Sequence, residues 1–190
     1  IDIINLYYNH LLSGNSARTL DVVNDDCVVD LNLLTNKPVL YVCNVDEASV
    51  KGNSFTKMVE QSISNDVAEI LIISAAIEAD INELESSCDK KEFLNEIGLE
   101  EPGVNKIIRS AYSLLGLQTF FTAGEKEVRA WTINQGAYAP EAAGVIHSDF
   151  EKGFIRAEVI SYEDRLAYET EHACREAGKI AIEGKKYIVK

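Results

Sequence analysis

Two short apolar segments separated by one amphipathic segment constrain the fold of this chain most strongly. Residues 37–43 (KPVLYVC) and 68–73 (AEILII) have the composition of buried strands, and residues 54–64 between them have the spacing of a short amphipathic helix. A strand, a helix and a second strand form a βαβ unit, in which the two strands are parallel. The sequence therefore predicts an α/β fold with a parallel sheet.

Polar residues follow both apolar segments at the point where each predicted strand ends. Residues 44–47 (NVDE) come directly after the first segment, and residues 74–76 (SAA) come directly after the second. The carboxyl ends of parallel strands meet at one edge of the sheet, and open α/β sheets bind their ligands there. We therefore expect Asn44, Glu47 and Ser74 to lie together at a binding site.

The rest of the chain divides into helical segments and a second module of mixed composition that begins near Gln118. Residues 1–20 have apolar side chains at helical spacing. The patterns that follow predict helices over 78–85, 90–97, 104–115 and 139–146, short strands between 118 and 133, and strands over 154–160 and from 187 onward.

The net charge of −13 and the sequence pI of about 4.6 limit the classes of partner. Wrapping of a polyanion requires clustered Lys and Arg side chains that neutralise phosphates. We therefore expect no DNA partner, although a local basic patch could still contact RNA.

The cysteines and the hydropathy point to a cytoplasmic protein. Cys27, Cys43, Cys88 and Cys174 form no Cys-x-x-Cys pair and no zinc-knuckle spacing, so we expect reduced thiols. The sequence has no signal peptide and no long uncharged apolar segment, so we expect no membrane partner. The first residue is Ile1 rather than Met, which is typical of a chain that starts inside a longer protein.

No arrangement of acidic, hydroxyl or histidine side chains points to catalysis. Three consecutive residues, His147, Ser148 and Asp149, cannot adopt the geometry of a catalytic triad. Glu78 and Asp80 are interpreted as charges near a helix N-terminus, where the helix dipole favours them. We therefore assign no catalytic residue and no metal ligand.

Four stretches of the sequence carry a more specific signal. They are NLLTNKPVLYVCNVDE (32–47), ISAAIEADINEL (73–84), GLEEPGVNKIIRSAYSLLGLQTFFTAGEKEVRAWTI (98–133) and APEAAGVIHSDFEKGFIRAEVISYED (139–164). These stretches resemble the YchF family, which consists of P-loop NTPases related to the Obg GTPases. Members of this family bind ATP and often GTP, hydrolyse them slowly and associate with ribosomes. The resemblance therefore implies a purine nucleotide and the ribosome as partners.

The resemblance also implies a domain organisation. Residues 1–33 would be the end of a helical, coiled-coil insertion with its connector, residues 34–117 the C-terminal part of a nucleotide-binding domain, and residues 118–190 a TGS-like domain with a β-grasp fold. The expected fold class is α/β, with the C-terminal part of a P-loop-NTPase-type parallel sheet and its helices, followed by a mixed α+β module. The last strand of the β-grasp sheet would be missing, which leaves a sheet edge open.

The sequence departs from the family because it has no G-x-x-x-x-G-K-[ST] phosphate loop. Without that loop, no nest of backbone N–H groups can hold the phosphates and no loop hydroxyl can bind Mg²⁺. ATP or GTP would need an upstream segment for its phosphates, and we expect Mg²⁺ only through that segment. We therefore expect no NTPase activity from this chain alone, and interpret it as part of a longer ATP or GTP hydrolase.

The residues after the first strand differ from the Asn-Lys-x-Asp with which ordinary GTP-binding proteins read guanine. The matching positions here are Asn-Val-Asp-Glu, and an ionised carboxylate accepts hydrogen bonds but cannot donate one to N1 of adenine. Backbone groups near Val45 and residues 74–76 would read adenine, while the Asn44 amide fixes the loop or contacts N7, and Asp46 is a turn or cap residue. The predicted base site, with ATP preferred, consists of Asn44, Val45, Glu47, Ser74, Ala75 and Ala76.

Four basic side chains of the second module are candidates for contact with ribosomal RNA or protein. The sequence of residues 152–154, which includes one of these side chains, predicts a tight exposed turn. Trp131 is expected in the core of the module. The alternative is four ordinary surface charges, paired with Glu125, Glu127, Glu151 and Glu158. The candidates are Arg129, Lys152, Arg156 and Arg165.

Two other functions stay open at this point. The chain could be a stand-alone module that binds ribosomes, RNA or a protein and has no NTPase activity. A third, weaker hypothesis is a structural adaptor that acts through the helical segment 1–20.

Overall fold

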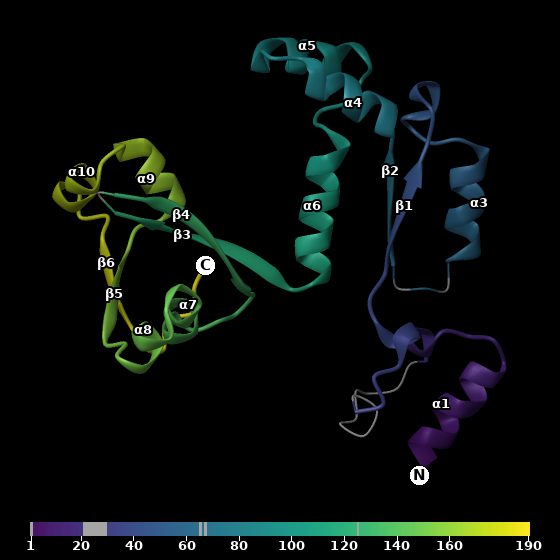
Figure 1. Cartoon of the computed structure of the whole chain (residues 1–190), viewed down its shortest axis with the longest axis horizontal. Helices are drawn as coiled ribbons and strands as arrows, with labels where there is room; N and C mark the ends of the chain where they lie inside the picture. The colour runs from purple at the N-terminus through teal and green to yellow at the C-terminus, as the bar shows by residue number, and fades with distance from the viewer. Residues whose placement is uncertain (1, 21–29, 65, 67, 125) are drawn as a thin grey trace. The chain divides into compact units, whose positions relative to one another are not determined.

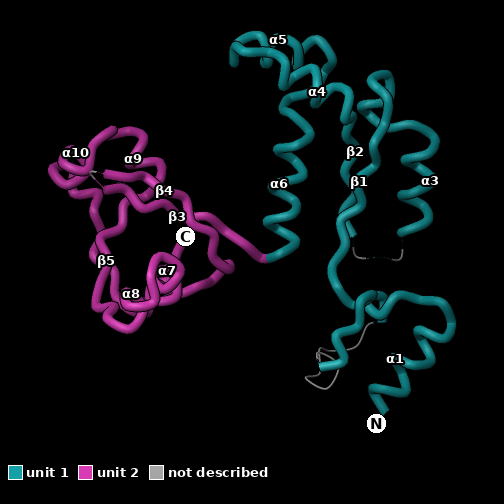
Figure 2. The backbone as a smooth tube through the Cα atoms, in the orientation of Figure 1, with its two compact units in different colours: residues 1–115 teal, residues 116–190 magenta. Residues whose placement is uncertain are grey.

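The computed structural model describes residues 2–20, 30–64, 66, 68–124 and 126–190, so Cys27 and Glu125 lie outside the described residues. The chain divides into two compact units (Figure 2). Unit 1 comprises residues 1–115, and unit 2 comprises residues 116–190.

Unit 1 contains the βαβ unit that the sequence predicts (Figure 1). Strands β1 (Leu40–Asn44) and β2 (Glu69–Ile73) are parallel, and helix α3 (Ser54–Ser62) lies between them in the sequence. The register pairs Asn44 with Ile73, so both strands end at the same level of the sheet. The mixed α/β fold with parallel strands is therefore confirmed for unit 1.

Both strands are less buried than their apolar composition predicts. No residue of β1 or β2 is fully buried, and Val42 is 43% exposed. Parallel strands become buried on both faces only where helices and further strands cover them, and the described sheet has two strands. The two strands therefore lie where the sequence predicts them, but the prediction that they are buried is wrong.

Helix α3 begins at a capping box. The Asn53 Oδ1 atom accepts hydrogen bonds from the N–H groups of Phe55 and Thr56 at 2.9 and 3.1 Å. In return, the Thr56 Oγ1 atom accepts a bond from the Asn53 N–H at 2.9 Å. These bonds satisfy donors that the first turn of a helix leaves unpaired, and they fix where the crossover from β1 to β2 begins.

Three helices follow β2 in unit 1, namely α4 (Ala75–Glu83), α5 (Ser87–Glu96) and α6 (Gly103–Leu114). Helices α4 and α5 lie beyond the carboxyl ends of the strands, whereas α6 runs beside β2 (Figure 1). A buried cluster joins α4 to α5 and consists of Ile77, Ile81 and Leu94, with Val50, Phe93, Ile97 and Leu99 packed against it.

Helix α6 is attached to β2 at both of its ends. Near the C-terminal end of α6, the Ser110 hydroxyl donates a hydrogen bond to the Glu69 carboxylate at 2.9 Å. At the N-terminal end, Gly103 is buried, and a Cβ atom added to it would lie 2.9 Å from Cγ2 of Ile73. The helix and the strand therefore run in opposite directions, and the start of α6 lies against the end of β2.

The N-terminal part of unit 1 is held by one partly buried ion pair. Helix α1 (Asp2–Leu12) is followed by a short 3-10 turn that carries Arg18, and the Arg18 guanidinium contacts the Asp66 carboxylate at 2.5 Å. The same guanidinium donates to the Thr35 carbonyl at 3.2 Å. Hydrogen bonding to Asp66 raises the pKa of Arg18 above its usual value. This pair ties the segment after α1 to the loop that leads into β2.

Unit 2 is a mixed α+β module. Its sheets are two antiparallel pairs, β3 with β4 and β5 with β6, among the residues described. Its core is built on Ile133, Ala137 and Ala142, with Phe120 and Val189 packed against them. In chain order the elements are β3 (Leu117–Ala123), β4 (Val128–Asn134), α7 (Ala139–Ile146), α8 (Ser148–Lys152), β5 (Arg156–Val159), α9 (Tyr162–Tyr168), α10 (Glu171–Glu176) and β6 (Ala181–Gly184).

The last residues of the chain pair with the residues that precede α7. Tyr138 and Ile188 form an isolated antiparallel bridge, and the Ala139 N–H donates to the Tyr187 carbonyl at 2.8 Å. The Val189 N–H donates to the Ala137 carbonyl at 3.0 Å. The extended segment predicted from residue 187 therefore makes strand-like hydrogen bonds, although its pairing is limited to one bridge.

We predict that the close approach of α6 to β2 makes Gly103 intolerant of a larger side chain. The Gly103→Ala variant should lose about 1–3 kcal/mol of unfolding free energy, because a methyl group would crowd a branched side chain of the strand. Urea unfolding followed by circular dichroism measures this loss. The Gly184→Ala variant is the control, because an added Cβ atom meets nothing within 4 Å there. Equal stability of the two variants would contradict the prediction.

Candidate functional site

The ends of β1 and β2 are joined by two hydrogen bonds, which bring the segments that follow the two strands together. The Ala75 N–H donates to the Asn44 Oδ1 atom at 3.0 Å. The Val45 N–H donates to the Ile73 carbonyl at 2.8 Å. The segment after the first strand and the segment after the second therefore form one edge, as the sequence predicts.

This edge is an open surface. Asn44, Glu47, Ala75 and Ala76 are exposed, whereas Val45 is half-buried. Glu47 opens a short 3-10 turn, Glu47–Ser49, and among the described residues its side chain has no hydrogen-bond or ion-pair partner. The amide and the carboxylate that the sequence singles out are therefore both accessible to a ligand.

The backbone donors of this edge differ in what they already bind. The N–H groups of Val45 and Ala75 are both occupied by internal hydrogen bonds. The first N–H groups of a helix have no acceptor within the helix, and Ala76 is the second residue of α4. Because Ala76 is an exposed residue, its N–H and the Asn44 Nδ2 amide are two donors that this edge can offer a ligand.

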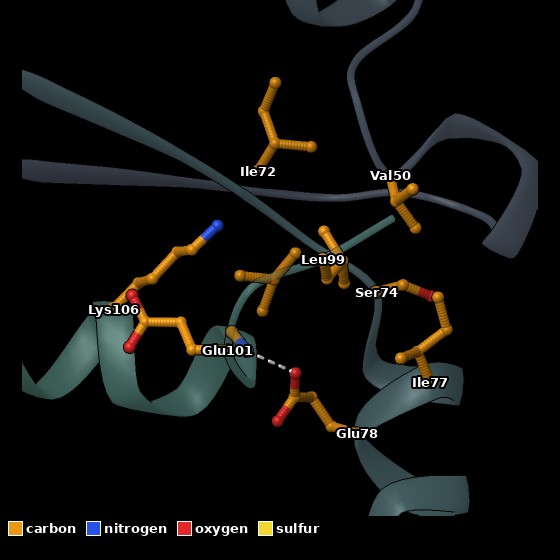
Figure 3. A pocket seen from close by; sticks show the side chains of 10 residues that line it. Val50, Ile72, Ser74, Ile77, Glu78, Leu99, Glu101 and Lys106 are labelled. Atoms are coloured by element: carbon orange, nitrogen blue, oxygen red, sulfur yellow. Dashed lines mark hydrogen bonds between the residues drawn. The ribbon is translucent and has the colours of Figure 1, made fainter. Parts of the chain in front are cut away.

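Ser74 lies beneath the edge and has an unusual environment. Its residue exposure is 4%, and its Oγ atom has no hydrogen-bond partner in the part of the chain that the structure describes. Ser74 lines a cavity of about 10 Å³, about the size at which a single water molecule is held. Figure 3 shows this cavity between the end of β2, the start of α4 and the start of α6. Asn44 and Glu47 do not line this cavity. The expectation that Ser74 lies with Asn44 and Glu47 at the binding edge is therefore wrong for its side chain, which is buried under the start of α4.

Glu78 links helix α4 to helix α6. Its Oε1 atom accepts a hydrogen bond from the Gly103 N–H at 2.6 Å, and its Oε2 atom accepts one from the Val104 N–H at 3.3 Å. The sequence predicts only that the Glu78 charge is favoured by the dipole of its own helix, α4. It does not predict the contact with α6. A signal was available, because Pro102 precedes α6 and offers no side-chain acceptor for its first N–H groups.

The four basic candidates of unit 2 lie on different elements. Arg129, Lys152 and Arg156 are exposed, and the Arg129 guanidinium lies 4.1 Å from the centre of the Trp131 ring. Arg165 is half-buried and donates to the Glu169 carbonyl. Arg129 lies on β4, Lys152 on α8, Arg156 on β5 and Arg165 on α9.

Three expectations for unit 2 need correction. Glu158 pairs with Arg175 at 2.8 Å and not with one of the four candidates. Phe154 is 9% exposed, so residues 152–154 do not form a fully exposed turn, because the ring that follows the turn packs inward. Trp131 is half-buried beneath Arg129 and donates through Nε1 to the Thr122 hydroxyl at 2.9 Å. It is therefore not among the fully buried core residues.

The described residues contain neither a metal-binding cluster nor a membrane-spanning helix. No cluster of three or more His, Cys, Asp or Glu side chains there could hold a metal ion. No described helix combines the length and the apolar character that crossing a bilayer requires.

Comparison with known proteins gives consistent matches. A family model named YchF-GTPase_C, described as "Protein of unknown function (DUF933)", matches residues 117–190. The chain is 52% identical over 182 residues to the ribosome-binding ATPase YchF of Escherichia coli O157:H7, a match that covers 95% of this chain and 50% of that protein. It is 47% identical over 182 residues to the ribosome-binding ATPase YchF of Bacillus subtilis (strain 168), covering 93% and 50% respectively.

A solved structure shares the fold over the whole chain. The match to the YchF GTPase of Schizosaccharomyces pombe has a TM-score of 0.85 and 35% sequence identity, and it covers 100% of this chain and 51% of that one. The chain thus spans about half the length of the curated relatives it matches. The resemblance expected from the sequence is confirmed, and the chain belongs to the YchF family.

Proposed function

We propose that this chain supplies the base-reading edge of a cytoplasmic, ribosome-associated purine-nucleotide hydrolase that prefers ATP. The observation that carries the proposal is the hydrogen bond from the Ala75 N–H to Asn44 Oδ1 at 3.0 Å, which holds two strand-end segments as one exposed edge. Relatives named ribosome-binding ATPase YchF support the coarse activity and the ribosome as partner. Another relative is called a GTPase, so the choice of base has to be argued from the residues.

The donors and acceptors of the edge fit a purine. The Asn44 Nδ2 amide can donate to purine N7, which accepts in both adenine and guanine. The Ala76 N–H can donate to an acceptor on the Watson–Crick side of the ring. Guanine also needs an acceptor for its N1–H and 2-amino groups, and the longer Glu47 side chain replaces the Asp that usually accepts there. Guanine therefore loses optimal bonds, and the preference shifts toward adenine.

The phosphates and the chemical step lie with other parts of the protein. The described residues contain no metal-binding cluster, and the sequence has no phosphate loop. We propose that residues 34–117 belong to the nucleotide-binding domain, that residues 118–190 form a TGS-like domain, and that residues 1–33 end a helical insertion. Mg²⁺ would then be held by the segment that carries the phosphate loop, and this chain contributes no catalytic residue.

We predict that Glu47 sets the balance between ATP and GTP. In the complete natural polypeptide, the Glu47→Asp variant should raise GTP affinity relative to ATP about tenfold, because the shorter carboxylate restores a charged hydrogen bond to guanine. The Glu47→Ala variant should also change the ratio. Isothermal titration with each nucleotide measures both effects.

The matched control for this experiment is the neighbouring carboxylate. Asp46 is exposed, and its side chain makes no cap hydrogen bond to the 3-10 turn that follows it. The Asp46→Ala variant should therefore leave the ATP-to-GTP ratio unchanged. A ratio that does not move in either Glu47 variant would remove Glu47 from the base site.

Ribosome association is proposed to involve unit 2. Most of the negative charge lies in residues 1–115, whereas the charges of residues 116–190 are nearly balanced, so unit 2 repels RNA less. Arg129, which covers the Trp131 ring, and Lys152 are exposed basic groups of this unit. A guanidinium stacked on an aromatic ring offers both a charge and a planar surface to a nucleic acid.

We predict that charge reversal of these two groups weakens ribosome binding. The Arg129→Glu, Lys152→Glu variant of the complete polypeptide should co-sediment with ribosomes several-fold less than the wild type, because each reversal adds repulsion from phosphate. The control is Lys57→Glu, an exposed lysine of α3 in unit 1. For the wild type, ribosome binding that is lost when ATP is removed would support a nucleotide-coupled NTPase. Ribosome binding that is the same with and without ATP would favour the stand-alone module. Equal sedimentation of both variants would contradict the assignment to unit 2.

A further inference from the structure

Helix α6 begins without a cap of its own. Pro102 occupies the N-cap position and makes no side-chain hydrogen bond to the helix. The N–H groups of Gly103 and Val104 instead donate to the Glu78 carboxylate at 2.6 and 3.3 Å. A carboxylate at the positive end of a helix dipole makes a charge-assisted hydrogen bond, which is stronger than a neutral one. Glu78 is therefore firmly attached to the start of α6.

The start of α6 is itself fixed against the end of β2. A Cβ atom at Gly103 would lie 2.9 Å from Cγ2 of Ile73 and 3.0 Å from Oε1 of Glu78. The backbone of α6 therefore approaches both the strand and the carboxylate as closely as a glycine permits. Figure 3 shows the Glu78 carboxylate reaching from its helix toward the start of α6, with the bond drawn as a dashed line.

Glu78 is also attached to the base edge through its backbone. The Glu78 N–H donates to the Ser74 carbonyl at 3.1 Å, and this bond closes the first turn of α4. The Ser74 hydroxyl caps nothing and has no hydrogen-bond partner among the described residues. The exposed Ala75 and Ala76 lie between Ser74 and Glu78, so they are supported by Asn44 on one side and by Glu78 on the other.

We propose that Glu78 is a positioning residue for the base site, which holds the first turn of α4 by binding it to the start of α6. This inference rests on the proposed reading of a purine by that turn. Glu78 touches no ligand in this arrangement, because its carboxylate is bound to the N-terminus of α6. Its loss frees the turn that carries Ala76, and the site then discriminates less between bases.

The test compares nucleotides that share a triphosphate and differ in the base. The probes are ATP and UTP, and their dissociation constants are measured by isothermal titration for the complete natural polypeptide. The Glu78→Ala variant should lower the ratio of ATP affinity to UTP affinity about tenfold while UTP affinity stays within about twofold, since an oriented hydrogen-bond partner is lost. The Glu78→Gln variant keeps an oxygen acceptor without the charge, so it should recover part of the ratio.

The control is Glu83→Ala, which removes another carboxylate of α4, one that is exposed and has no ion pair among the described residues. It should leave the ratio unchanged. An equal fall in ATP and UTP affinity in Glu78→Ala would overturn the positioning role. So would a ratio of ATP to UTP affinity that stays at the wild-type value in both folded variants, Glu78→Ala and Glu78→Gln. If the wild type does not prefer ATP to UTP, the proposed base site itself is wrong. That outcome differs from a wild-type preference for ATP that the Glu78 substitutions leave unchanged, which contradicts only the role of Glu78.

Discussion

The hydrogen bond from the Ala75 N–H to the Asn44 amide oxygen is the contact on which the site depends. Parallel pairing ends β1 and β2 at the same level, but two strand ends at one level still leave their following segments free to diverge. The 3.0 Å bond joins these segments, and the Glu78 carboxylate then fastens the turn after β2 to helix α6. An exposed edge acquires a defined geometry by these two contacts, without an enclosing pocket.

Local sequence patterns were sufficient to predict the βαβ unit and its polar edge. Apolar runs of strand length, each followed by polar residues, predict the parallel pairing and the exposed position of Asn44. They do not predict that the Ser74 side chain is buried beneath the edge, because that depends on the packing of α4 and α6 against β2. The role of Glu78 could not be predicted in the same way, because its partner Gly103 is 25 residues further along the chain. The burial of Phe154 and the exposure of Val42 also depend on packing between elements, which periodicity does not report.

The family assignment and the site geometry answer different questions about function. Similarity to YchF proteins from bacteria and yeast assigns the family, and the names of these relatives include both ATPase and GTPase. In the proposed base site the choice depends on two residues: Glu47 takes the position of the aspartate that usually reads guanine, and Val45 takes that of the lysine that packs on the base. In the proposed function, this part of the protein reads the base and another segment binds the phosphates.

Hydrogen–deuterium exchange of the complete natural polypeptide tests the central claim most directly. The exchange of each backbone N–H is compared in the free protein, with ATP, and with inorganic tripolyphosphate, which has no base. Base reading at the strand-end edge predicts slower exchange of residues 44–49 and 74–78 with ATP and not with tripolyphosphate. Bound ATP that leaves both segments unprotected, or protection of them by tripolyphosphate alone, would contradict the claim.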